Sequence, residues 1–435
     1  MSRAESTTPD TENQQDDSGN VGDMQNKHWE PFATNLCDQP SAQAASVQAR
    51  QRRRIAQLEE KLEALESGRA VKEKQANYYT SQGRAIRRVV VLFDNVEDLV
   101  AENDRRYEDE NEDHTIDQDR LQAGYVTLST TLPWLFRKGA EMEYDEYTHM
   151  LKLLRQGADS ARGDDTSKLK ALVAEWVNRD LKPEFPLDSD DKHTRGFSND
   201  ACGRLLCPAE LDWNNPAQVV LLRFREKCSL FTRVRTGIRD RSEGCIVTDL
   251  SFPAYLYDNY TANPDDLEEG LFKSKILLQG YKAVFTSPSS AKDVEGDGDG
   301  ADVIQNNRRA KKSFNGVSKV KKHVAQIINM RKVTPRSIAY IACLLRFSLS
   351  SVTSWRSIDG DFDYAQFWCT IVDFFERPPG RGARRRVDKL LEWWNRKIFG
   401  RSQRNDISDA AKASLSVNAL AKQRAQRDDA AFDSA

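Results

Sequence analysis

Three aspartates, Asp359, Asp361 and Asp363, alternate with other residues in the most aromatic stretch of the chain. Carboxylates spaced in this way suggest a calcium loop, because Ca²⁺ prefers oxygen ligands. An EF-hand loop beginning at Asp359 would need glycine at its sixth position and glutamate at its twelfth. Those positions hold Tyr364 and Thr370. The spacing therefore argues against a calcium site.

The same stretch has the residues that begin a helix. Asp363 at the N-cap can accept a hydrogen bond from the amide of Gln366, which can bond back to complete a capping box. Phe362 and Phe367 then form a hydrophobic staple around the cap. Pro378-Pro379 ends the helix, whose apolar face is predicted to comprise Phe367, Ile371, Phe374 and Phe375. We therefore interpret this stretch as a structural joint and not as an ion or substrate site.

The remaining reactive side chains match no catalytic or metal-binding motif. The seven cysteines are odd in number and scattered, which is typical of free thiols in a reducing compartment. A zinc site drawn from His193, Cys202, Cys207 and Cys228 matches no standard spacing. The sequence also lacks a nucleophile elbow, a P-loop and a dinucleotide-binding glycine pattern. Carboxylates are plentiful enough for a metal-dependent nuclease, but nothing singles out a pair, so we expect no enzyme, cofactor or bound metal.

A basic tract between residues 308 and 322 contains no acidic residue. Such runs are typical of nuclear import signals and of contacts with nucleic-acid phosphates. Valines and isoleucines at helical spacing in and after the tract leave a packed helix with a solvated basic face as a third alternative. The candidate contact residues are Arg308, Arg309, Lys311, Lys312, Lys319, Lys321 and Lys322.

A heptad pattern lies ahead of the most apolar part of the chain. With Ile55 and Leu58 as positions a and d, the register continues to Val100 with mostly apolar or aromatic residues. The exceptions are Arg69, Lys72, Gly83 and Glu97. The pattern favours a coiled coil that joins copies of the chain through Ile55, Leu58, Leu62 and Leu65. The alternative is one long helix whose second half packs on its own domain.

Composition divides the chain into structured and unstructured parts. Charged residues make up 30% and hydrophobic residues 39%, so part of the chain should be unfolded. We predict a mainly α protein in which an N-terminal long helix or coiled coil precedes an irregular multi-helix globular domain, with disordered tails. The predicted segments are a tail at 1–45, the coiled coil or long helix at 46–105, an acidic linker at 106–120, the helical domain at 121–400 with a flexible internal loop at about 286–306, and a tail at 401–435.

Three helix starts are predicted from one local signal. Asn215-Pro216, Asn263-Pro264 and Thr334-Pro335 each place an N-cap residue before a proline at the first helical position. The last helix is predicted over residues 387–399, with Gly400 at its C-terminal cap.

Charge and hydropathy limit the cellular setting. The formal net charge is −2, so binding to a polyelectrolyte would need local patches. The N-terminus lacks the apolar core of a signal peptide. The most apolar stretch, 338–349, is too short to span a membrane and contains Arg346. We expect no membrane association and an intracellular location in the nucleus or cytoplasm, with the nucleus favoured.

Several motifs resemble those of an uncharacterised domain family of mushroom-forming fungi. They are found at residues 231–235, 250–257, 350–355, 359–364, 374–376 and 391–399. The resemblance covers roughly residues 120–400 and implies a single helical domain and a fungal source. The function of that family is unknown, so the resemblance implies no catalytic residue.

Two functions follow as expectations. The first is a non-enzymatic interaction or scaffold protein whose self-associating helix presents the helical domain to protein partners that the sequence does not identify. The alternative is a nuclear nucleic-acid-binding protein, descended from a mobile element, that uses the basic tract 308–322.

Overall fold

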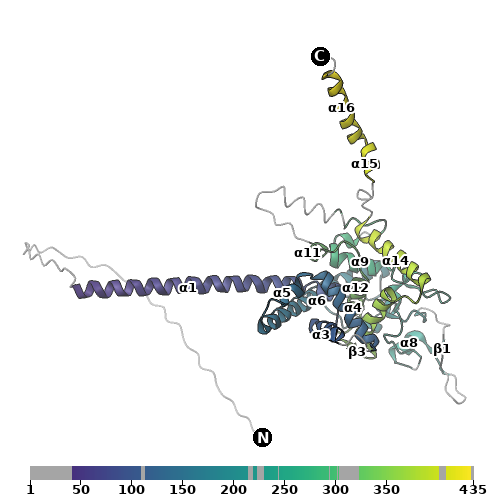
Figure 1. Cartoon of the computed structure of the whole chain (residues 1–435). Coiled ribbons are helices and arrows are strands. Elements are labelled where there is room, and N and C mark those ends of the chain that lie inside the picture. The colour runs from purple at the N-terminus through teal and green to yellow at the C-terminus, as the bar shows by residue number, and fades with distance from the viewer. Residues whose placement is uncertain are drawn as a thin grey trace, which may run out of the picture. The chain divides into compact units, whose positions relative to one another are not determined.

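A computed structural model describes residues 42–108, 113–213, 219–222, 230–242, 244–292, 294–300, 302, 323–400 and 408–432 (Figure 1). It divides into two compact units, Met1–Arg69 and Ala70–Ala435. The fold is mainly α, as predicted. Within the described ranges, no helix combines the length and apolarity needed to cross a membrane.

The helices and strands follow one another along the chain as shown in Figure 1. The helices are α1 (Ala42–Gly83), α2 (Ile86–Val89), α3 (Val96–Glu108), α4 (Ile116–Thr131), α5 (Trp134–Gly139), α6 (Tyr144–Leu181), α7 (Asp200–Leu206), α8 (Val234–Arg239), α9 (Lys275–Tyr281), α11 (Val324–Ile327), α12 (Pro335–Leu349), α13 (Tyr364–Glu376), α14 (Arg381–Phe399), α15 (Asp409–Ser414) and α16 (Ser416–Phe432). The strands form two antiparallel pairs, β1 (Val219–Leu222) with β2 (Leu230–Arg233) and β3 (Ile358–Asp359) with β4 (Phe362–Asp363).

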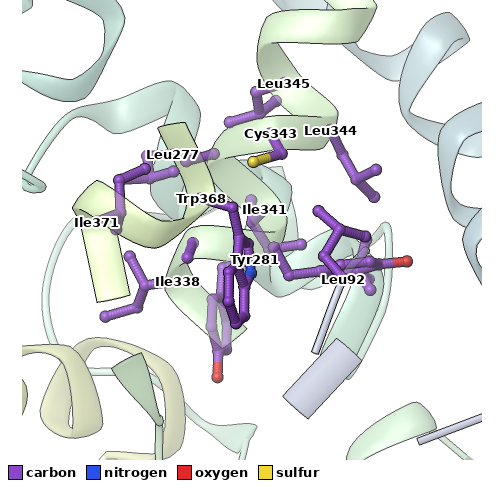
Figure 2. Close-up of a cluster of buried hydrophobic side chains, with 14 of the residues drawn as sticks. Leu92, Leu277, Tyr281, Ile338, Ile341, Cys343, Leu344, Leu345, Trp368 and Ile371 are labelled. Atoms are coloured by element: carbon purple, nitrogen blue, oxygen red, sulfur yellow. The ribbon is translucent and has the colours of Figure 1, made fainter. Parts of the chain in front are cut away.

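Helix α12 forms the centre of the hydrophobic core. Thr334 caps its first turn by accepting a hydrogen bond from the amide of Ser337 at 3.2 Å, which confirms the predicted start. Every residue from Arg336 to Leu349 is buried, because α2, α6, α9 and α13 all pack against this helix. Figure 2 shows side chains of α12 gathered with Leu277 of α9 and with Trp368 of α13.

The joint that precedes α13 forms as predicted in two respects. The Asp363 carboxylate accepts hydrogen bonds from the amides of Ala365 and Gln366, at 2.7 and 3.2 Å. The rings of Phe362 and Phe367 form the staple, with centroids 5.1 Å apart. The capping box is absent from the described contacts, because the amide of Asp363 donates to Asp249 instead, at 3.3 Å.

The sequence interpretation missed the β3–β4 hairpin. Its two-residue loop has Gly360 in the first position with a φ of +65°, a left-handed conformation that suits glycine in a type II′ turn. Gly-Asp between Ile358-Asp359 and Phe362-Asp363, in which apolar and polar residues alternate, was therefore a hairpin signal.

The heptad register continues further than the helix does. Helix α1 ends at Gly83, and the next two register positions, Ile86 and Val90, are buried in the core. A Cβ atom on Gly83 would lie 2.0 Å from the carbonyl oxygen of Leu154 in α6. Gly83 therefore permits two helices to cross in close contact, and the second half of the register packs on its own domain.

The segment predicted as an acidic linker is largely helical where it is described. Helix α3 continues to Glu108, and α4 begins after Thr115 with a capping box to Gln118. The acids Asp117 and Asp119 lie in the first turn of α4, where negative charge suits the helix dipole.

Of the three proline-based helix starts, the one at Asn263-Pro264 is wrong, and the one at Asn215-Pro216 lies outside the described residues. After Asn263-Pro264 the chain makes a turn in which the Asn263 side chain accepts from the amide of Asp265, at 3.0 Å. The next helix, α9, begins only after Ser274. The described residues that come next after Pro216, Val219–Leu222, form strand β1 in place of the predicted helix.

Other segments are also more ordered than predicted. In the loop at 286–306, the amide of Gly298 donates to the carbonyl of Arg396 at 2.9 Å, at the end of α14. A Cβ there would lie 2.3 Å from the Lys397 carbonyl oxygen, so glycine permits close backbone contact and does not mark a flexible linker. In the predicted C-terminal tail, residues 409–432 form α15 and α16. Helix α14 begins earlier than predicted and ends, as predicted, at Phe399, with Gly400 as its C-terminal cap.

Candidate functional site

The first candidate is an apolar face on the N-terminal part of α1, which we call the α1 face: Ile55, Leu58, Leu62 and Leu65. The side chains of Ile55, Leu58 and Leu62 are 53, 58 and 59% exposed. The side chain of Leu65 lies outside the described residues. Large aliphatic side chains that are exposed at heptad spacing on a single helix are typical of a coiled-coil helix without its partner.

The second candidate is a pocket beside the β3–β4 hairpin, which we call the hairpin pocket. It has a volume of about 170 Å³. Its polar lining consists of Arg241, Arg346, Ser350, Ser351, Asp359 and Asp361. Its apolar lining includes Phe197, Leu206, Ile238, Cys245, Ile246 and Val247. The pocket thus joins the end of α12 to segments that lie far apart in the sequence.

The three alternating aspartates have separate roles around this pocket. Asp363 caps α13, Asp361 forms an ion pair with Arg241, and Asp359 lines the pocket. In the part of the chain that the structure describes, no group of three or more His, Cys, Asp or Glu side chains could hold a metal ion. The three carboxylates therefore do not converge on one point.

Arg346 is the functional candidate that the sequence interpretation missed. It belongs to the last turn of α12 and is only 4% exposed. Its guanidinium carbon lies 3.4 Å from the ring centroid of Phe362 and 5.4 Å from that of Tyr364. The side chain donates no hydrogen bond to any residue that the structure describes. A charged residue within an otherwise apolar buried helix was the available signal.

Two more buried cations lie at the C-terminal end of α12. Lys192 donates to the carbonyls of Phe347 and Val352, and Arg195 donates to the carbonyl of Ser348 at 2.8 Å. The carbonyls of Phe347 and Ser348 belong to the last turn of α12, at the negative end of the helix dipole, which favours cations. Burial, together with the nearby charge of Arg195, lowers the pKa of Lys192 to about 7.

The described cysteines are poor candidates for nucleophiles. Burial raises the pKa of Cys202 and of Cys207 to about 12, and that of Cys369 to about 11. Their thiols are therefore protonated at neutral pH, whereas a nucleophile would need the thiolate. Cys37 and Cys228 lie outside the described residues.

The predicted basic tract also lies outside the described residues, so the structure places none of its seven cations. Another basic surface is visible on α14, where Arg381, Arg385 and Lys389 are exposed and form no ion pair with any described residue. Next to it is a groove of about 440 Å³ that includes Trp393 and Lys273.

Comparison with known proteins gives one match. The model of a family of unknown function, DUF6698, matches residues 156–399, which is more than half of the chain. This range includes the hairpin pocket and excludes the α1 face. No curated protein and no solved structure matches the chain.

Proposed function

Because the chain belongs to DUF6698, a family of unknown function, no activity can be carried over, and we propose from its own structure that it is a non-enzymatic interaction protein. Two copies associate through the α1 face, and each presents a helical domain to protein partners. The observation that carries this proposal is the exposure of Ile55, Leu58 and Leu62 on one side of a helix.

The hydrophobic effect provides the driving force for pairing. Each of these side chains exposes more than half of its surface in the single chain, and fully burying one contributes about 1.5–3 kcal/mol. Isoleucine at position a with leucine at position d favours two-stranded coiled coils. The apolar seam covers about two heptads, so we expect a reversible dimer whose population rises with concentration.

The charges beside the seam favour a parallel dimer in register. Arg54 and Lys61 occupy g positions, and Glu59 and Glu66 occupy e positions. In a parallel pair, a g residue faces the e residue of the next heptad on the partner helix. Arg54 would then face Glu59 and Lys61 would face Glu66, whereas antiparallel pairing would bring the g-position cations together.

The cellular setting belongs to the same proposal. The free thiols of the described residues support an intracellular protein, in the nucleus or the cytoplasm. The sequence resemblance supports a mushroom-forming fungus as its source. The lack of a catalytic motif supports a role without enzymatic activity.

Co-purification tests self-association. We expect one tagged copy of the full chain to retain a second, differently tagged copy. Leu58→Asp combined with Leu62→Asp should reduce retention roughly tenfold or more, because burying two charges would cost over 1.4 kcal/mol.

The matched control is Ala56→Asp with Gln57→Asp, which adds the same charge to exposed positions outside the seam. This control should retain the partner copy as well as the unmodified chain does. Equal retention by the seam variant and the control would overturn the proposal.

The exposed cations of α14 support the alternative function, nucleic-acid binding in the nucleus by a protein of mobile-element descent. Phosphate contacts by lysine and arginine weaken with salt because binding releases counterions. We expect a glutamine variant of the basic residues to be retained more weakly on DNA or RNA, with a flatter salt dependence. The residues replaced are Arg308, Arg309, Lys311, Lys312, Arg381, Arg385 and Lys389. If the unmodified chain is not retained on DNA or RNA at low salt, this alternative is excluded.

A further inference from the structure

We propose that the hairpin pocket is a binding site for a small monocarboxylate, whose carboxylate Arg346 holds and whose hydrocarbon part contacts the apolar wall. The site lies within the region that matches the family and is separate from the α1 face. If the hairpin pocket bound no carboxylate, the proposed self-association through the α1 face would therefore be unaffected.

The first argument is the state of the Arg346 side chain. A guanidinium has five N–H donors in one plane. The face of this guanidinium lies over Phe362, which leaves its donor edge free for an acceptor. Burying a charge without a partner is costly, yet no described residue accepts a hydrogen bond from Arg346. An acceptor that enters the pocket would supply the missing bonds.

The second argument is the balance of charge around the pocket. Arg346 lines it, and Lys192 and Arg195 are buried next to it and donate only to backbone carbonyls among the described residues. Arg241 is already paired with Asp361. Within the lining, Arg241 and Arg346 balance Asp361 and Asp359, the latter having no described ion-pair partner. The positive surplus comes from the buried Arg195 and from Lys192, which is partly protonated at neutral pH. A bound anion would therefore be favoured.

The third argument selects the kind of anion. Planar carboxylates match the fork of arginine with two parallel hydrogen bonds. Asp359 and Asp361 line the same pocket and would repel a dianion such as phosphate more strongly than a monoanion. The rest of the lining is largely apolar and includes Phe197, Leu206 and Val247. A short aliphatic carboxylate can bond to Arg346 through its carboxylate and contact the apolar lining through its hydrocarbon chain.

Calorimetric titration of the full chain tests this site. The probes are acetate, butyrate and hexanoate, with inorganic phosphate and butylamine for comparison. We expect the three carboxylates to bind with an affinity that rises with chain length. Phosphate should bind more weakly, and butylamine should not bind. Arg346→Met should weaken hexanoate binding roughly tenfold or more, since charge-assisted hydrogen bonds contribute about 1.5–3 kcal/mol.

Two further variants keep the test decisive. Arg346→Lys preserves the charge, so the fold should survive even if Arg346→Met unfolds, and it should still bind more weakly because lysine lacks the fork. Arg162→Met is the matched control and should leave hexanoate binding unchanged. Arg162 also stacks on an aromatic ring, with its guanidinium carbon 5.0 Å from the ring centroid of Trp355, but it does not line the pocket. Unchanged binding by Arg346→Lys, or no carboxylate binding by the unmodified chain, would overturn the proposal.

Discussion

Replacing Arg88 with methionine is expected to lower the free energy of unfolding by about 3–5 kcal/mol. Arg88 of α2 donates two hydrogen bonds to Asp165 of α6, at 2.8 and 2.9 Å. The two side chains are only 3 and 5% exposed. The Tyr340 hydroxyl of α12 donates to the same carboxylate at 2.9 Å. Loss of the arginine would leave a buried charge with one neutral donor, which is why the expected effect is large.

Urea unfolding followed by circular dichroism measures this loss. The double variant Arg88→Met, Asp165→Leu should recover much of the stability, because neither buried charge then lacks a partner. Arg84→Met is the matched control. Its partner Asp164 is 64% exposed, so the loss should be about 1 kcal/mol or less. A single Arg88 variant no less stable than the Arg84 variant would contradict the buried pair.

The second large effect is expected from Gly157→Ala in α6. A Cβ on Gly157 would lie 2.0 Å from the carbonyl oxygen of Thr80, and this contact is with backbone, so it cannot be relieved by rotating a side chain. The helices would have to move apart. We expect a loss of about 3 kcal/mol, at the upper end for overpacking.

Gly163→Ala provides a control on the same helix. No atom lies within 4 Å of a Cβ built there, so the gain in helix propensity should raise stability by about 0.5–1 kcal/mol. The two substitutions are chemically identical and should therefore have opposite signs in the same urea experiment. If Gly157→Ala also stabilises the protein, α1 and α6 do not cross in close contact at this point.

The sequence predicts a helix start well where both hydrogen-bond partners of the cap lie in the same short segment. Asp363 and Thr334 begin helices as expected because a cap and its amides lie within three residues of each other. Asn263 has the same side chain chemistry and also accepts a local amide, but the chain then turns. An asparagine cap and an asparagine turn use the same hydrogen bond, so the local sequence does not distinguish them.

The features that the sequence did not predict depend on distant segments. Gly83 is a misfit in the heptad register and Gly298 lies in the loop that the sequence predicts to be flexible, yet both are points of close backbone contact in the structure. The hairpin pocket likewise requires Arg346 to meet residues 196–197 and 245–247. No spacing rule within one segment contains that information, so Arg346 could be noted only as a charge in an apolar stretch.

Sedimentation equilibrium of the full chain over a range of concentrations is the most direct test of self-association through the α1 face. We predict a mass that rises from that of one 49.5 kDa chain toward that of two, and that stays at one chain in the Leu58→Asp, Leu62→Asp variant. A mass of one chain at every concentration, in the unmodified protein, would contradict it.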